Sequence, residues 1–162
     1  NEHPISTAIT TMTPAGHTNN QKKAAFKKLV LSNNNIETVS SNAFHLLQSC
    51  NEIYINQNKL KKIASYSFSL MDYAEKIIKI MLNGNRLDSQ SFEENFIHLN
   101  EHTYLLLSLA TNQITTLNQK IFKPLLQKNV TIDLTNNPID CTQLSWLRND
   151  GSLFGKTKGI RC

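Results

Sequence analysis

The feature of this sequence that most restricts its fold is an asparagine that recurs after a short run of alternating apolar residues. The pattern L-x-x-L-x-L-x-x-N-x-L-x-x-L-x-x-x-x-F fits residues 26–44, 50–68 and 104–122, and the front half of it fits residues 77–87. Successive asparagines are separated by 24, 27, 27 and 25 residues, and they are Asn34, Asn58, Asn85, Asn112 and Asn137. Internal periods of about 20 to 50 residues indicate stacked repeat architectures.

The residue types of the repeat predict short parallel strands that stack on one another. The segment x-L-x-L-x alternates apolar and other positions, which is typical of a strand with one buried face. The asparagine then turns the chain out of the strand, because its amide can donate and accept hydrogen bonds with backbone groups of its own and neighbouring turns. We expect the phenylalanines that end the repeats, such as Phe44 and Phe68, to form a spine on the opposite side.

This pattern resembles the leucine-rich repeat family, and the match covers residues 26–137. The resemblance implies an α/β fold, a leucine-rich repeat solenoid with a short curved parallel β-sheet on the concave face and an irregular or helical convex side. The third repeat departs from the family pattern. Its segment SLMDYAEKIIKIML has helical spacing, so we expect a short helix at about residues 68–76, and Phe92 and Phe96 compete for its last slot.

Residues 1–25 are interpreted as a degraded or truncated N-terminal repeat, in which Ile5 and Met12 fall where Leu29 and Ile36 stand in the next repeat. The segment has no signal-peptide pattern and no cysteine cluster of the kind that caps this edge in the family. An uncapped end leaves apolar surface and a strand edge open. We therefore expect a longer parent chain, a covering partner or self-association.

Residues 138–162 resemble the cysteine-flanked C-terminal cap of extracellular leucine-rich repeat proteins. The matching residues are Asn137, Pro138, Cys141, Leu144, Trp146, Leu147 and Cys162. The family cap usually has two disulfides and a C-x-C pair, but Gln143 stands at its second cysteine, so the resemblance implies one disulfide, Cys141–Cys162. Trp146 is expected on a short helix at about residues 144–149, over the end of the core. The cap and the 24-residue repeats ending in phenylalanine are similar to arthropod secreted proteins such as a non-catalytic luciferase subunit.

A disulfide-closed cap predicts a secreted or extracellular protein, because disulfides persist in oxidising compartments. The sequon Asn129-Val130-Thr131 agrees with this location. Asn129 falls on a slot of the repeat that is normally apolar, and an outward glycan would explain the exchange. Cys50 occupies the same slot in its own repeat, where we expect a buried, inert thiol.

No catalytic motif is found in the sequence, so we expect a non-catalytic protein without a cofactor. The best metal candidates are His98 and His102, with Glu94 and Glu101 nearby, but their place on the convex side favours two solvated histidines and no metal. The net charge is +5 with scattered lysines, which does not favour nucleic-acid binding. No apolar run is long enough for a membrane helix.

The family's concave face predicts three outward columns of residues along the strands. The central column is Val30, Tyr54, Met81, Ser108 and Asp133, the preceding one is Lys28, Glu52, Lys79, Leu106 and Thr131, and the following one is Ser32, Asn56, Asn83, Ala110 and Thr135. The partner-binding candidates are Val30, Tyr54, Met81 and Leu106, which make an apolar diagonal, with Ser108, Asn56 and Asn83 beside it. We expect an extracellular module that binds a protein partner there. The alternatives are a self-associating structural subunit of a secreted assembly and a non-catalytic subunit of an enzyme complex.

Overall fold

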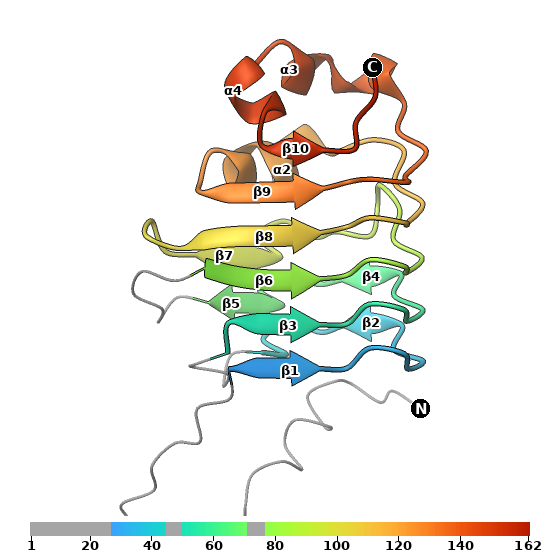
Figure 1. Ribbon diagram of the computed structural model, residues 1–162, viewed down its shortest axis with the longest axis vertical. Coiled ribbons are helices and arrows are strands. Elements are labelled where there is room, and N and C mark those ends of the chain that lie inside the picture. The colour runs from blue at the N-terminus through green and yellow to red at the C-terminus, as the bar shows by residue number, and fades with distance from the viewer. Residues whose placement is uncertain (1–26, 45–49, 71–76) are drawn as a thin grey trace, which may run out of the picture.

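The computed structural model describes residues 27–44, 50–70 and 77–162, and this part of the chain is built around one six-stranded parallel sheet (Figure 1). The strands, in chain order and in sheet order, are β1 (Lys28–Val30), β3 (Glu52–Tyr54), β6 (Ile77–Met81), β8 (Tyr104–Ser108), β9 (Val130–Asp133) and β10 (Thr157–Lys158). Parallel neighbours require crossover connections. The predicted mixed α/β class with a parallel sheet is confirmed, whereas the predicted N-terminal repeat, residues 1–25, lies outside the described residues.

The connections between the sheet strands run behind the sheet and add short strands of their own (Figure 1). These are β2 (Thr38–Val39), β4 (Lys62–Ile63), β5 (Phe68–Leu70) and β7 (Ile97–Leu99). β2 pairs with β4 and β5 pairs with β7, both in parallel. Closer to the C-terminal end, the helix α2 (Gln119–Leu126) takes the corresponding place and buries Phe122, Leu125 and Leu126.

The helix predicted at about residues 68–76 is wrong at its first residues, because Phe68–Leu70 form the strand β5. Phe68 is in register with Ile97 of β7, and its backbone N–H donates to the Phe96 carbonyl at 3.0 Å. Residues 71–76 lie outside the described residues. Pairing with a strand that lies 29 residues later in the chain therefore determines the conformation of Phe68–Leu70, although the local sequence has helical spacing.

The core lies between the sheet and the connections behind it. The residues that fill it from the sheet strands are in register with one another: Ile53, Ile80, Leu107 and Ile132 are each at most 1% exposed. Burial of a large aliphatic side chain is worth about 1.5–3 kcal/mol. The same register that stacks the strands thus also stacks the core in layers.

Phenylalanine side chains line the back of this core, as the sequence predicts. The rings of Phe44 and Phe68 stack with centroids 5.1 Å apart. Phe92 and Phe96, the two candidates for one slot of the third repeat, are both buried, and both rings lie against Phe122, at 5.2 and 5.9 Å. The longer third connection therefore accommodates two rings where the others place one.

The recurring asparagines form a ladder of hydrogen bonds along the molecule. The side chain of Asn58 donates to the carbonyls of Ile55 at 3.0 Å and Leu31 at 2.9 Å, and it accepts from the backbone N–H of Ile36 at 3.0 Å. Asn85, Asn112 and Asn137 each bind their own turn and the preceding one in the same way. Each side chain therefore joins two adjacent turns of the chain and satisfies backbone groups that would otherwise be unpaired.

The residue before each of these asparagines has a positive φ. The angles are 59° at Asn33, 55° at Gln57, 67° at Gly84, 54° at Thr111 and 58° at Asn136. This left-handed conformation tightens the turn after the strand and costs a non-glycine residue about 1–2 kcal/mol. Four of the five positions carry a side chain, so the fold tolerates that cost repeatedly.

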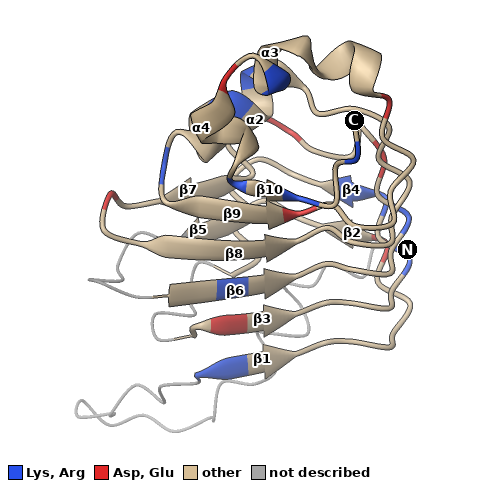
Figure 2. Ribbon diagram, turned by 45° about the horizontal axis from the view of Figure 1, so that its top comes forward, with Lys and Arg blue, Asp and Glu red and all other residues tan. Residues whose placement is uncertain are grey.

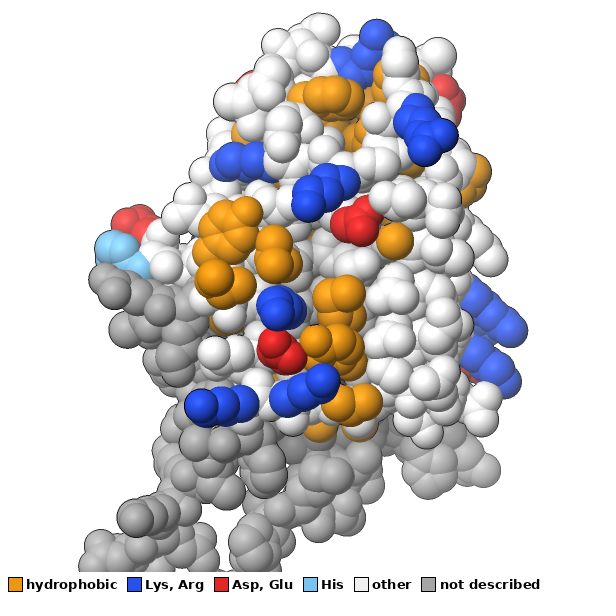
Figure 3. Space-filling view, viewed as in Figure 1, with side chains coloured by type: hydrophobic (Ala, Val, Ile, Leu, Met, Phe, Trp, Pro, Cys, Tyr) orange, Lys and Arg blue, Asp and Glu red, His pale blue; other side chains and the backbone are white. Residues whose placement is uncertain are grey.

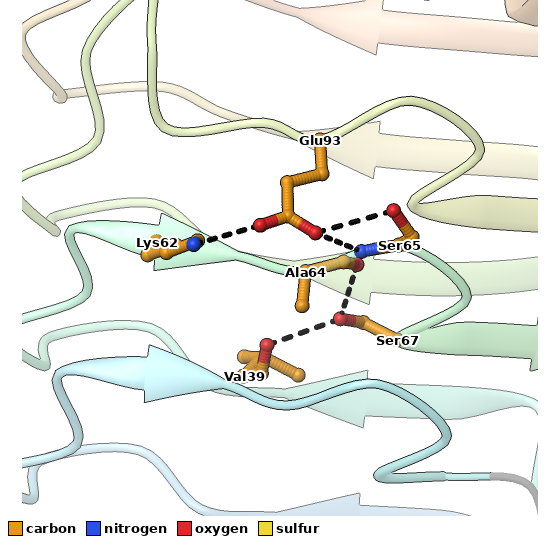
Figure 4. A network of polar contacts seen from close by, with 6 residues as sticks. All are labelled: Val39, Lys62, Ala64, Ser65, Ser67 and Glu93. Carbon is orange, nitrogen blue, oxygen red and sulfur yellow. Dashed lines mark hydrogen bonds and ion pairs between the residues drawn. The ribbon is translucent and has the colours of Figure 1, made fainter.

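A second polar network ties three connections together behind the sheet (Figure 4). The Glu93 carboxylate accepts from Ser65, whose backbone N–H lies at 2.9 Å, and pairs with the Lys62 ammonium at 2.7 Å. These contacts, the lysine first, lower the pKa of Glu93 from 4.5 to about 2. The fully buried Ser67 hydroxyl lies 3.1 Å from the Val39 carbonyl and 2.6 Å from that of Ala64.

The C-terminal segment closes one end of the core. It contains the 3₁₀ turn η1 (Cys141–Leu144) and the helices α3 (Ser145–Arg148) and α4 (Gly151–Phe154), which bury Leu144, Leu147 and Leu153. Trp146 lies on α3 and packs against the core, as predicted. Cys141 and Cys162 form the predicted disulfide, with Cα atoms 5.8 Å apart. No helix among the described residues is both long and apolar enough to cross a membrane.

Candidate interaction surface

The predicted columns lie side by side on the front of the sheet. Register pairs Val30 with Tyr54, Tyr54 with Met81, and Met81 with Ser108. The register of the same strands also aligns the preceding column. The following column lies just after the strands, where backbone hydrogen bonds align it, for example from the Gln57 N–H to the Asn83 carbonyl at 3.0 Å. Figure 3 shows apolar side chains running up the centre of this face with charged ones beside them.

The exposure of the seven candidate residues differs along the face. Val30 is 58% exposed, whereas Tyr54, Met81 and Leu106 are half-buried, as are Asn56 and Asn83. Ser108 is only 8% exposed, so it offers little surface to a partner. The accessible apolar part of the diagonal therefore lies over β1, β3, β6 and the first half of β8.

A network of charged and aromatic side chains holds Tyr54 in place. The Tyr54 hydroxyl donates to Glu52 at 3.1 Å, and the other oxygen of that carboxylate pairs with the Lys79 ammonium at 3.1 Å. Lys28 lies 4.4 Å from the centre of the Tyr54 ring, within the range of a cation–π contact. Figure 2 shows the resulting alternation of charge over β1, β3 and β6.

These contacts shift the pKa of each titratable member of the network. The hydrogen bond from Lys79, followed by that from Tyr54, lowers the pKa of Glu52. Desolvation, followed by the hydrogen bond to Glu52, raises the pKa of Tyr54, and the bond to Glu52 also raises the pKa of Lys79. Each of the three pKa shifts stabilises the form that the group has at neutral pH, namely ionised Glu52, neutral Tyr54 and protonated Lys79. The network therefore keeps the same hydrogen bonds at neutral pH.

Two exposed residues of this face are missing from the predicted site. Ile77 and Tyr104 are register partners at the starts of β6 and β8, and they are 58% and 42% exposed. The repeat pattern placed them in an inward apolar slot, which is wrong for both. The available signal was strand alternation, since each lies two residues before an outward residue, Lys79 or Leu106.

Asn129 stands in the slot of Ile77 and Tyr104 and is also exposed. The interpretation that Asn129 replaces a core residue is therefore corrected, because among the described residues in this slot only Cys50 is buried. The Cys50 thiol donates to the Glu52 carbonyl at 3.3 Å, and its burial raises its pKa, which keeps it protonated. This agrees with the predicted buried thiol.

The candidate metal ligands lie on β7 and in the turns on either side of it. His98 is on β7, with its ring 6.3 Å from that of Tyr66, while His102 is exposed in the turn before β8. His98 also lines a cavity of about 160 Å³ between β7 and α2, together with Lys120 and Lys128. Within residues 27–44, 50–70 and 77–162, no three His, Cys, Asp or Glu side chains gather closely enough to hold a metal ion.

Comparison with known proteins finds no protein-family model that matches this sequence and no curated protein that matches it. The function of the front face is therefore argued from its residues.

Proposed function

We propose that this chain is a secreted leucine-rich repeat protein that binds another protein through the front face of its sheet. Three observations support the repeat family: one parallel strand for each sequence repeat, the asparagine ladder that joins neighbouring turns, and the left-handed residue before each of these asparagines. The solenoid's concave face then corresponds to the front of the sheet, with residues 26–137 as the repeats and 138–162 as the cap.

The observation that carries the binding role is the in-register run of the accessible side chains of Val30, Tyr54 and Met81, because tyrosine and methionine are enriched in interface cores. Tyr54 is held by contacts to Lys28 and Glu52. A side chain that is already positioned loses less conformational entropy when a partner binds. The face thus combines an apolar centre with a fixed aromatic anchor.

The charges of the same face favour an acidic partner over a second copy. The strands of this face carry three lysines, Lys28, Lys79 and Lys158, against two carboxylates. Glu52 pairs with Lys79, and Asp133 is in register with Lys158. A small excess of positive charge therefore faces a partner, and the whole chain carries a net charge of +5. Two such faces would bring like charges together, at a cost in affinity. We infer that the partner presents carboxylates around an apolar patch.

Secretion is supported by the Cys141–Cys162 disulfide, which is typical of an oxidising compartment. The exposed sequon at Asn129 is compatible with the same route. The proposed role assigns no reaction to this chain. The alternatives remain a self-associating structural subunit and a non-catalytic subunit of an enzyme complex, and the experiment below separates the first of these from the proposed function.

The test is the double variant Tyr54→Glu/Met81→Glu, compared with Gln90→Glu/Gln127→Glu, which adds the same charge at exposed positions outside the front face. Each form is used to capture proteins from the extracellular fluid that contains it, and the affinity for a purified captured partner is then measured by calorimetry. We expect a loss of about 30-fold or more for the first pair, equivalent to about 2 kcal/mol, and none for the second. Equal binding by both pairs would refute the proposal.

Sedimentation of the purified chain tests the self-association alternative. We expect a monomer at micromolar concentration. A defined oligomer that Tyr54→Glu/Met81→Glu dissociates would instead assign the front face to assembly.

A further inference from the structure

A second apolar patch lies on the front face, apart from the central column. It consists of Ile77 and Tyr104, which face each other across β6 and β8, and we call it the corner patch. Its side chains are 58% and 42% exposed, so it is among the most accessible apolar surface of the described chain. Figure 3 shows apolar side chains gathered at this end of the strands. Exposed apolar groups side by side favour a covering group.

The residue beside this patch on the next strand is Asn129. Leu105 is in register with Val130, and the Leu105 N–H donates to the Asn129 carbonyl at 2.8 Å, so Asn129 is the neighbour of Tyr104 across the sheet. Adjacent strands lie about 4.8 Å apart. The sequon's hydroxyl residue joins the same corner, because the Thr131 hydroxyl lies 2.8 Å from that of Tyr104.

The side-chain nitrogen of Asn129 lies on the Tyr104 side of its strand. It donates to the carbonyl of Glu101 at 3.4 Å, and Glu101 is in the turn that leads into β8. A glycosylated amide keeps one N–H, so this hydrogen bond is compatible with a sugar on the nitrogen. The exposed side chain leaves the nitrogen open to modification.

We propose that Asn129 carries an N-linked glycan whose first sugar packs its apolar C–H face on the Tyr104 ring and covers the corner patch. In the secretory pathway, a glycosyltransferase joins the amide nitrogen to C1 of the sugar of a lipid-linked oligosaccharide; the lipid diphosphate leaves and the amide loses one proton. The electron-rich face of the tyrosine ring attracts the sugar's C–H groups, and contact removes apolar surface from water. The glycan thereby leaves the central column as the accessible apolar surface for a protein partner.

The inference rests on the proposed secretion, and its test supplies that route independently. The chain is expressed behind a heterologous signal peptide in insect cells, and its intact mass is measured before and after enzymatic removal of N-glycans. We expect one glycan, absent from Asn129→Gln and retained in Thr131→Ser, which keeps both the sequon and the hydroxyl. An unmodified secreted chain overturns this inference and leaves the partner-binding proposal standing.

The packing on Tyr104 is tested by a thermodynamic cycle. The glycan's effect on Tm is the difference between the glycosylated chain and Asn129→Gln, and it is measured in the wild-type, Tyr104→Ala and Tyr66→Ala backgrounds. Tyr66 is the control, since it is 46% exposed but lies behind the sheet. We expect a gain of about 2–4 °C in the wild type and in Tyr66→Ala, and less than half of it in Tyr104→Ala. The same gain in all three backgrounds overturns the packing.

Discussion

Replacing Asn85 by alanine removes one rung of the asparagine ladder, and the structure allows its cost to be worked out. The side chain is 8% exposed; it donates to the carbonyls of Leu82 at 2.9 Å and Ile55 at 3.1 Å and accepts from the buried Leu60 N–H at 3.0 Å. Both carbonyls keep a second donor, from Asn112 and Asn58, respectively. The main loss is therefore the buried N–H of Leu60, which is left without its acceptor.

The two lost donor bonds cost about 1 kcal/mol each, and the unsatisfied amide costs about 1–3 kcal/mol, so we expect Asn85→Ala to lower the free energy of unfolding by about 3–5 kcal/mol. Asn34→Ala is the matched control. Asn34 is exposed, and among the described residues it donates to Leu31 and Ser32 of its own turn, so about 1 kcal/mol is expected.

Urea unfolding followed by far-UV circular dichroism measures both losses, with the m-value checked for each variant. A difference of about 2 kcal/mol or more between the two variants supports the ladder. Equal losses, or less than about 1 kcal/mol for Asn85→Ala, would show that the bond between turns contributes little and would refute the reasoning.

Three further predictions concern the turn, the rear network and the cap. Thr111→Asn should raise the free energy of unfolding by about 0.5–1 kcal/mol in urea, because a β-branched residue is strained at φ 54° and asparagine is less so. The folded pKa of Glu93 is lowered to about 2, so its contribution is present above about pH 4.5 and is lost as pH falls toward 2; melting curves of Glu93→Gln should lose less stability over that window than wild type, and parallel curves would contradict this. Cys141→Ser/Cys162→Ser should cost about 3 kcal/mol in the same urea assay, as the closed loop spans 21 residues, and an unchanged midpoint would count against a constraint on the unfolded chain.

Much of the fold could be predicted from the sequence because each sequence repeat contributes one strand to the parallel sheet. The alternation of Leu29, Leu31 and their counterparts predicts strands with one buried face, and the equal offsets predict which residues share a column. The register pairs Lys28 with Glu52 and Val30 with Tyr54, as those offsets require. The cap's disulfide followed from the family resemblance, with Gln143 explaining why a single bond was expected.

The sequence did not show which way a side chain faces at positions where the repeat pattern and strand alternation predict opposite orientations. Ile77 and Tyr104 occupy the repeat's apolar slot, yet they extend β6 and β8 by two residues and so turn outward. Cys50 holds the same slot but precedes the shorter β3, and it is buried. In these three repeats the length of the strand, which depends on its neighbours, decides which way the slot faces. Asn129 holds the slot directly before β9 and is exposed as well.

The parallel order of the strands, the central column and the position of the cap could be predicted from the sequence, because these features depend on spacing along the chain. Three features could be found only in the folded chain: Phe68 begins a strand, Phe92 and Phe96 both reach the core, and the corner patch lies beside Asn129. Each of these depends on contacts between residues about 25 or more positions apart, and local periodicity carries no information about such contacts. The spacing of the asparagines, in contrast, predicts both which side chain makes the hydrogen bonds and which neighbouring turn it binds.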